Sequence, residues 1–128
     1  MQQLGALMNY WKKYVEATEC LTRALDAARQ CNDFRLELET LVELAEAKRH
    51  AAPGEAIDTL LQCAGLAKNV GDLATEQRSW QRLGLIHESM NSIPKARESY
   101  ETSLLLAQQL SLDAAVATLQ NTLEQIRQ

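Results

Sequence analysis

The stretch Trp80-Gln81-Arg82-Leu83-Gly84-Leu85-Ile86-His87, together with the segment that follows it, decides the fold. Its apolar residues recur every three or four positions, which is the spacing of one face of an α-helix. A second helical face follows at Ala96, Tyr100 and Ser103. Pro94 stands at the start of that second helix, where its missing N–H costs nothing. The stretch therefore predicts two helices joined by a short turn.

The second of these faces recurs along the chain. Ala17, Ala56 and Ala96 open three segments that align without a gap, 39 and 40 residues apart. Four, seven, eight and eleven residues after each alanine, the chain holds Leu21, Leu60 and Tyr100; Ala24, Cys63 and Ser103; Leu25, Ala64 and Leu104; and Ala28, Ala67 and Ala107. The small residues at offsets 0, 7 and 11 let a neighbouring helix approach closely. A fixed period of this kind predicts a stack of similar helical units.

The third unit resembles the tetratricopeptide repeat, whose pattern is W-x2-L-G-x2-Y…A-x3-F. Trp80, Leu83, Gly84 and His87, then Ala96, Tyr100 and Ser103, carry the resemblance. The match is fair in the first unit, at Leu4-Gly5-x-x-Met8, and loose in the second. There either Glu43-Leu44 or, after a shift of one residue, Leu44-Ala45 takes the Leu-Gly place. The period exceeds the usual repeat of about 34 residues and resembles long-helix variants of the family.

The resemblance implies a single all-α domain, a right-handed α-α superhelix (solenoid) of antiparallel helix pairs. We expect repeats at about 1–32, 33–71 and 72–110, and a capping helix at about 111–128. The corresponding helices are expected at about 2–12, 15–31, 34–50, 54–70, 73–90, 93–110 and 112–127. The first helix is about two turns shorter than its equivalent in the third unit, so we expect the C-terminal part of a longer array. The alternative is a small protein whose first helix is short.

Composition restricts the class of protein. The chain has 128 residues, of which 46% are hydrophobic and 5% aromatic, with a net charge of −4. Few Gly and Pro residues argue against an all-β fold. An acidic chain without a basic stripe makes nucleic acid an unexpected partner. The sequence has no apolar run of about 18 residues and no signal peptide, so we expect a cytoplasmic protein without a membrane span.

The sequence offers little that could carry catalysis. His87 stands at the place of the family's Tyr and is expected to pack against the partner helix. Cys20, Cys31 and Cys63 are expected to be reduced packing residues, because they lack the spacing of a zinc site and their number is odd. We therefore expect no enzyme, no cofactor and no metal.

The resemblance also implies where a partner would bind, because first helices line a concave groove in this family. The matching positions are Ala6, Asn9 and Tyr10; Leu38, Leu41, Ala45, Lys48 and Arg49; and Arg78, Gln81, Leu85, Glu88 and Ser89. Arg49 and Arg78 together could hold a carboxylate, which a guanidinium group fits with two hydrogen bonds. The clamp by which some members grip chaperone tails is not reproduced. The alternative is that these residues are ordinary solvent-facing side chains.

Trp11 falls in the expected turn between the first two helices. It either plugs the end of the groove or is an exposed anchor for a partner. The expected function is a non-catalytic scaffold that binds a partner peptide or helix in the groove. Self-association through the first or last helix, giving a homo-oligomer, and a ligand- or peptide-sensing regulatory domain are the alternatives.

Overall fold

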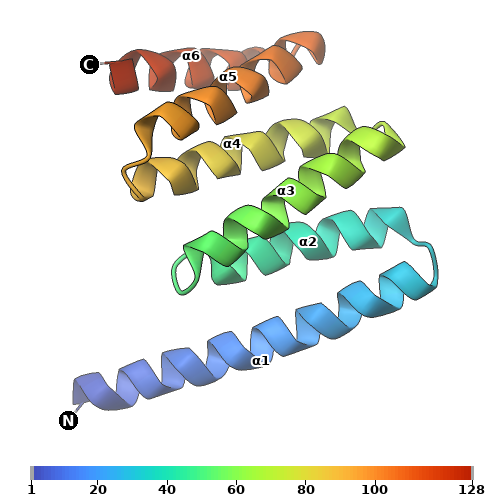
Figure 1. The fold of residues 1–128 in the computed structure, drawn as a ribbon, viewed down its shortest axis with the longest axis vertical. Helices are drawn as coiled ribbons and strands as arrows, with labels where there is room; N and C mark the ends of the chain where they lie inside the picture. The colour runs from blue at the N-terminus through green and yellow to red at the C-terminus, as the bar shows by residue number, and fades with distance from the viewer. Residues whose placement is uncertain (1, 128) are drawn as a thin grey trace.

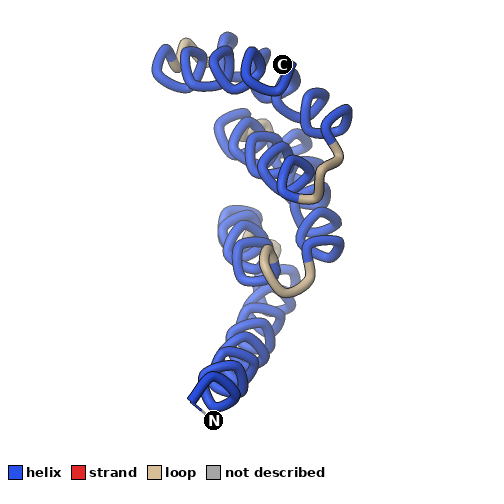
Figure 2. The backbone as a smooth tube through the Cα atoms, turned by 90° about the vertical axis from the view of Figure 1, so that its left-hand side faces the viewer, coloured by secondary structure: helices blue, strands red, loops and turns tan. Residues whose placement is uncertain are grey.

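The computed structural model describes residues 2–127, with side chains from Tyr10 to Ile126, and all of its regular structure is helical. The helices are α1 (Gln2–Gln30), α2 (Phe34–Lys48), α3 (Pro53–Val70), α4 (Leu73–Ser89), α5 (Ile93–Gln109) and α6 (Asp113–Arg127). Each helix packs against the next one along the chain and runs antiparallel to it, so the helices stack from α1 to α6 (Figure 1). Viewed from the side, they lie in two staggered columns, with the turns crossing between them (Figure 2). The prediction of an all-α fold of antiparallel helices is confirmed.

The first two expected helices are one. Helix α1 runs without a break through Trp11-Lys12-Lys13-Tyr14, where a turn was expected. The physical reason is local sequence: Pro53 and Pro94 stand in the first turns of α3 and α5 and disrupt a preceding helix, whereas this segment contains no Pro or Gly. Continuing the helix therefore costs nothing. As a result, the N-terminal half of α1 extends beyond α2 instead of folding back (Figure 1).

The helix that closes each unit, α1, α3 or α5, ends in the same way. Asn32, Gly71 and Ser111 have positive φ angles of 54°, 81° and 56°, and each lies fifteen residues after the alanine that opens its segment. The next backbone N–H bonds back across this left-handed residue, from Asp33 to the carbonyl of Ala28, from Asp72 to Ala67 and from Leu112 to Ala107, over 2.9, 2.8 and 3.0 Å. This is the Schellman ending of a helix. The chain thus reverses at equivalent points in all three units.

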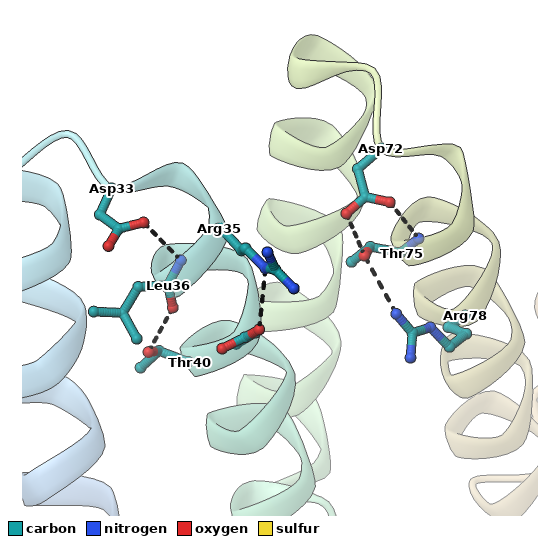
Figure 3. Close-up of polar contacts among 8 residues, drawn as sticks. Asp33, Arg35, Leu36, Thr40, Asp72, Thr75 and Arg78 are labelled. Carbon is teal, nitrogen blue, oxygen red and sulfur yellow. Dashed lines mark hydrogen bonds and ion pairs between the residues drawn. The ribbon is translucent and has the colours of Figure 1, made fainter.

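The helix that follows begins with a capping aspartate in two of the three cases. Asp33 accepts a hydrogen bond from the backbone N–H of Leu36, and Asp72 accepts one from Thr75, over 3.2 and 3.1 Å. Figure 3 shows these caps on α2 and α4. Each satisfies an N–H that the first turn of a helix leaves without an intrahelical partner.

The repeated face forms the core in the second and third units. Ala56, Leu60, Cys63 and Ala67 in α3, and Ala96, Tyr100, Ser103 and Ala107 in α5, are at most 1% exposed. Cys63 donates to the carbonyl of Leu38 over 3.9 Å, and Ser103 donates to the carbonyl of Gln77 over 2.9 Å. These are equivalent contacts, because Leu38 and Gln77 are 39 residues apart. Among the side chains of α1 that the structure describes, Leu25 and Ala28 are buried, in the half that α2 covers, and Ala17 is exposed.

The structure also decides the alignment of the second unit. Glu43 is exposed, whereas Leu44 and Ala45 are buried, as are Leu83 and Gly84. Leu44-Ala45 therefore takes the Leu-Gly place. The equivalent positions of α2 and α4 are 39 residues apart, whereas those of α3 and α5 are 40 apart, so the spacing from Leu44 to Ala56 is one residue shorter than the spacing from Leu83 to Ala96.

Gly84 makes room for the ring of Tyr100. A Cβ atom added at Gly84 would lie 2.6–2.9 Å from three atoms of this ring. Burial of Tyr100, with Glu88 adding to the effect, raises the pKa of its hydroxyl to about 12. Because Gly84 has no side chain, α4 and α5 can approach closely enough for the ring of Tyr100 to lie against the backbone of α4.

We expect Gly84→Ala to destabilise the protein by about 1–3 kcal/mol, because the added Cβ would overlap the ring of Tyr100, which is 1% exposed. The matched control is Gly65→Ala in α3, where an added Cβ meets nothing within 4 Å. That substitution should stabilise the protein by about 0.5–1 kcal/mol, since alanine is the better helix former. Chemical denaturation of both variants measures the difference. Equal effects of the two substitutions would contradict the steric role of Gly84.

Candidate functional site

A groove runs between α2 and α4, the two first helices of the second and third units. Its central part encloses about 370 Å³ and is lined by Glu46, Arg49, Arg78, Gln81, Arg82 and Leu85. An ion pair from Arg82 to Glu46, with an N–O distance of 2.7 Å, links the two helices across it.

Two smaller hollows extend the central part along the same helices. One, of about 60 Å³, is lined by Leu38, Glu39, Val42 and Thr75 and shares Arg78 and Arg82 with the centre. The other, of about 200 Å³, is lined by His50, Ile86 and Ser89 and shares Arg49 and Leu85. Because neighbouring hollows have residues in common, they form one elongated groove. We call this surface the α2–α4 groove.

The centre of the α2–α4 groove is positively charged. Arg49, Arg78 and Arg82 face it, and Glu46 is its only lining carboxylate among the residues that the structure describes. Glu46 pairs with Arg82 and, over 3.2 Å, with Arg49. Arg78 donates to the Thr75 hydroxyl over 3.4 Å, and no carboxylate of the described residues lies within 4 Å of its guanidinium nitrogens. One lining carboxylate thus faces three guanidinium groups.

Arg78 is held beside the start of α4. Asp72 accepts hydrogen bonds from the Thr75 hydroxyl, over 2.7 Å, and from its backbone N–H. These two bonds lower the pKa of Asp72, and the charges of Arg78 and Arg35 add a smaller effect in the same direction. Figure 3 shows Arg78 pointing toward the hydroxyl of Thr75. The cap of the helix and the position of the arginine are therefore coupled.

The side chain of Gln81 is held by a hydrogen bond from a buried residue, Gln77. The amide nitrogen of Gln77 donates to the Gln81 side-chain oxygen over 3.2 Å and to the Ser103 hydroxyl over 3.0 Å. Both Gln77 and Ser103 are buried. This network fixes the side chain of a groove residue through contacts with α5, so the wall of the groove is ordered in advance of any partner.

Six of the residues that the sequence indicated line the α2–α4 groove: Arg49, Arg78, Gln81 and Leu85 at its centre, and Leu38 and Ser89 in the two smaller hollows. The sequence analysis missed Glu46 and Arg82 at the centre of the same groove. Both could have been found, because Glu46 lies three residues before Arg49 and Arg82 lies four residues after Arg78, on the same helix faces.

The expectation for Leu41 was wrong. Leu41 is 1% exposed and packs in the core with Leu44 and Cys63, and Ala45 is buried as well. The cause is the alignment of the second unit, because a shift of one residue turns a helix by about 100°. With equivalent positions 39 residues apart, Arg78, Gln81 and Leu85 correspond to Glu39, Val42 and Glu46. All three of these line the groove.

Two further indicated residues lie outside the centre of the groove. Glu88 is directed toward α5, where its carboxylate accepts a hydrogen bond from the Tyr100 hydroxyl over 3.5 Å. Lys48 lines a separate hollow of about 520 Å³ between α1 and the start of α3, with Tyr14 and Glu55 among its neighbours. Neither residue is among those that line the central part.

The indicated residues of α1 are far from this site in the sequence and lie on its N-terminal half. Tyr10 and Trp11 are 48% and 51% exposed. The rings of Trp11 and Tyr14 pack edge to face, with centroids 5.4 Å apart. Trp11 therefore does not plug the groove, and that alternative is wrong. The side chains of Ala6 and Asn9 lie outside the described residues.

Of the three cysteines expected to be packing residues, only Cys63 is buried; Cys20 and Cys31 are exposed, because they lie on the face of α1 and in the turn that no other described helix covers. Burial raises the pKa of the Cys63 thiol, and burial together with Lys95 lowers the pKa of His87. Within the described part of the chain, no three His, Cys, Asp or Glu residues are grouped as a metal would require. None of the helices described is long and apolar enough to cross a bilayer.

Comparison with known proteins adds no relative. No protein-family model matches the chain, and no curated protein matches it. The resemblance to the tetratricopeptide repeat stays a prediction from the sequence pattern.

The cap at Asp72 makes a testable contribution to stability. Asp72→Ala should lower the free energy of unfolding by about 1 kcal/mol at neutral pH, the usual effect of removing an N-cap. Because the pKa of Asp72 is lowered in the folded state, its charged form stabilises the protein above the ordinary value of 3.8. The difference from the wild type should shrink as the pH falls below that value. Denaturation curves over this pH range measure it.

Asp72→Asn is the control, because asparagine retains a capping oxygen but has no carboxylate to protonate. The stability difference between Asp72→Asn and Asp72→Ala should stay constant over the same pH range. A difference between the wild type and Asp72→Ala that does not change with pH would show that the charge of Asp72 plays no part.

Proposed function

We propose that the chain is a non-catalytic protein-binding module of the tetratricopeptide type, a right-handed superhelix that takes an acidic segment of a partner in the α2–α4 groove. The observation that carries the proposal is the charge at the groove's centre, where Arg49, Arg78 and Arg82 face one carboxylate, Glu46. The molecule as a whole is acidic, with a net charge of −4. A basic groove on an acidic molecule favours an acidic partner over a basic one.

The shape of the groove fits a chain segment better than a compact ligand. It is a row of three connected hollows along two helices. Leu85 is exposed at its centre and offers apolar contact area, while Gln81 offers an amide donor beside it. A segment that alternates acidic and apolar side chains would satisfy both kinds of group. Guanidinium groups bind carboxylates with two parallel hydrogen bonds, which gives direction as well as attraction.

Freeing the arginines for a partner costs little. The side chains of Arg82 and Glu46 are 36% and 48% exposed, so their ion pair is partly in contact with solvent. Exposed pairs of this kind contribute about 0–1 kcal/mol. A carboxylate of the partner can therefore take the place of Glu46 on Arg82, or bind the same guanidinium group beside it, without a large loss of stability. Arg78, which has no carboxylate partner within 4 Å among the described residues, is the first anchor.

The test is a titration with a fluorescein-labelled octapeptide in which acidic residues, Asp or Glu, alternate with Leu. The comparison is a peptide in which Lys replaces each acidic residue. We expect only the acidic peptide to bind, and we expect Arg78→Glu to weaken its binding by about tenfold or more, since a favourable contact becomes a repulsion. Fluorescence anisotropy measures the affinity.

The control is Lys68→Glu, which makes the same change of charge on α3. Lys68 is exposed and lines none of the three hollows of the groove. Binding that falls equally in the two variants would show that only overall charge matters. No binding of the acidic peptide, or binding that Arg78→Glu leaves unchanged, would refute the groove as the site.

A further inference from the structure

The three arginines at the centre of the α2–α4 groove have more hydrogen-bond donors than the described residues use. Glu46 offers one oxygen to each of two arginines: Oε1 lies 3.2 Å from Arg49 and Oε2 lies 2.7 Å from Arg82. Both oxygens of this carboxylate are thus occupied. Arg78 donates to the Thr75 hydroxyl over 3.4 Å and, among the described residues, to no carboxylate. Each guanidinium group has five N–H donors, so donors for a further anion remain.

Glu46 shows how this surface holds an anion. Arg49 lies at the end of α2 and Arg82 lies within α4, so the guanidinium groups of two helices converge on one carboxylate. Arg78 lines the same hollow of about 370 Å³. This volume is within the range of about 300–1,000 Å³ that is typical of pockets for small ligands. An anion from outside therefore meets donors that are already assembled.

The charge and the number of arginines together indicate which anion fits. Three positive charges and one negative charge line the centre, which leaves a surplus of two positive charges. A carboxylate of a partner supplies one negative charge and two oxygens. A phosphorylated serine or threonine carries a charge of about −1.5 to −2 at neutral pH and has three acceptor oxygens. One such phosphate offers an oxygen to each of the three arginines and balances the surplus charge.

The phosphate of a nucleic acid fits this place less well. Each phosphodiester carries a single negative charge, and its neighbours along the strand would approach a molecule with a net charge of −4. The hollow beside the centre, which Arg78 also lines, contains a further carboxylate, Glu39. A polyanion that follows the groove would pass this carboxylate, whereas a single phosphorylated side chain needs only the centre.

We propose that the centre of the α2–α4 groove recognises a phosphorylated serine or threonine in the partner's acidic segment. Arg49, Arg78 and Arg82 each donate to one phosphate oxygen. The side chain of Glu46 is 48% exposed, so it can turn toward solvent when the phosphate takes its place on Arg82. This inference rests on the proposed function, because it names the group for which the segment is bound. Binding then depends on the phosphorylation state of the partner.

The test compares four fluorescein-labelled octapeptides in which acidic residues alternate with Leu. Three of them differ only at the fifth position, which is phosphoserine, glutamate or serine. The fourth has glutamate at both the fifth and the sixth position, which supplies two charges on separate carboxylates. We expect the phosphoserine peptide to bind about tenfold more tightly than either glutamate peptide, because one phosphate engages all three arginines. Fluorescence anisotropy measures the affinities.

Arg78 is the residue that should distinguish the two anions. In Arg78→Gln the phosphate loses its third guanidinium donor, so the preference for phosphoserine over glutamate should fall from about tenfold to about twofold. The matched control is Lys68→Gln on α3, which removes the same charge from an exposed residue that lines none of the three hollows. It should leave the preference unchanged. Arg78 is exposed as well, and circular dichroism verifies that both variants are folded.

Each contrary result has a separate meaning. If the phosphoserine peptide binds no more tightly than the single or the paired glutamate peptide, the phosphate inference is overturned while the proposed function stands. A preference that Arg78→Gln leaves at tenfold places the phosphate elsewhere. A labelled single-stranded oligonucleotide that binds as tightly as the phosphoserine peptide assigns the arginines to a nucleic acid instead. If none of the four peptides binds, the proposed function fails together with this inference.

Discussion

The close approach of consecutive helices is the constraint on which the rest of the structure depends. Small residues make it possible: Ala56 and Ala96 have no exposed surface, and Gly84 lies directly against the ring of Tyr100. Because α3 is held tightly between α2 and α4, the separation of those two helices is set by its narrow face. The groove therefore owes its existence to residues that do not line it. Its arginines would be ordinary surface charges on a looser stack.

Sequence reasoning succeeded where local chemistry decides the structure. Helices α2 to α6 begin and end close to the expected positions, because Pro53, Pro94 and the left-handed residue Gly71 mark their ends. It failed at Trp11-Lys12-Lys13-Tyr14, where the repeat alignment favoured a turn but nothing in the segment interrupts a helix. A family pattern says where a turn stands in other units. Only the residues of this unit decide whether it forms.

The same distinction explains the groove. In the third unit the motif around Gly84 fixes the phase of α4, and Arg78, Gln81 and Leu85 were placed correctly on one surface. In the second unit the motif is weak, and an alignment shifted by one residue selected Leu41 from the core. The sequence left both alignments of this unit open, because the choice depends on how α2 meets α3 in space. Errors of one residue are small in sequence and large in a helix, where they change the side that a residue faces.

Because α1 is unbroken, any change in its angle to the other helices moves its N-terminal end. Its 29 residues make a rod of about 44 Å at about 1.5 Å per residue, anchored over only its second half. The half that extends beyond α2 is about 22 Å long, so a tilt of about 10° would move its end by about 4 Å. Whatever holds the tip can thus sense, or impose, small changes in the angle between α1 and the stack. If one partner binds the N-terminal end of α1 and another binds the stacked helices, the stiffness of this single helix sets the distance between them.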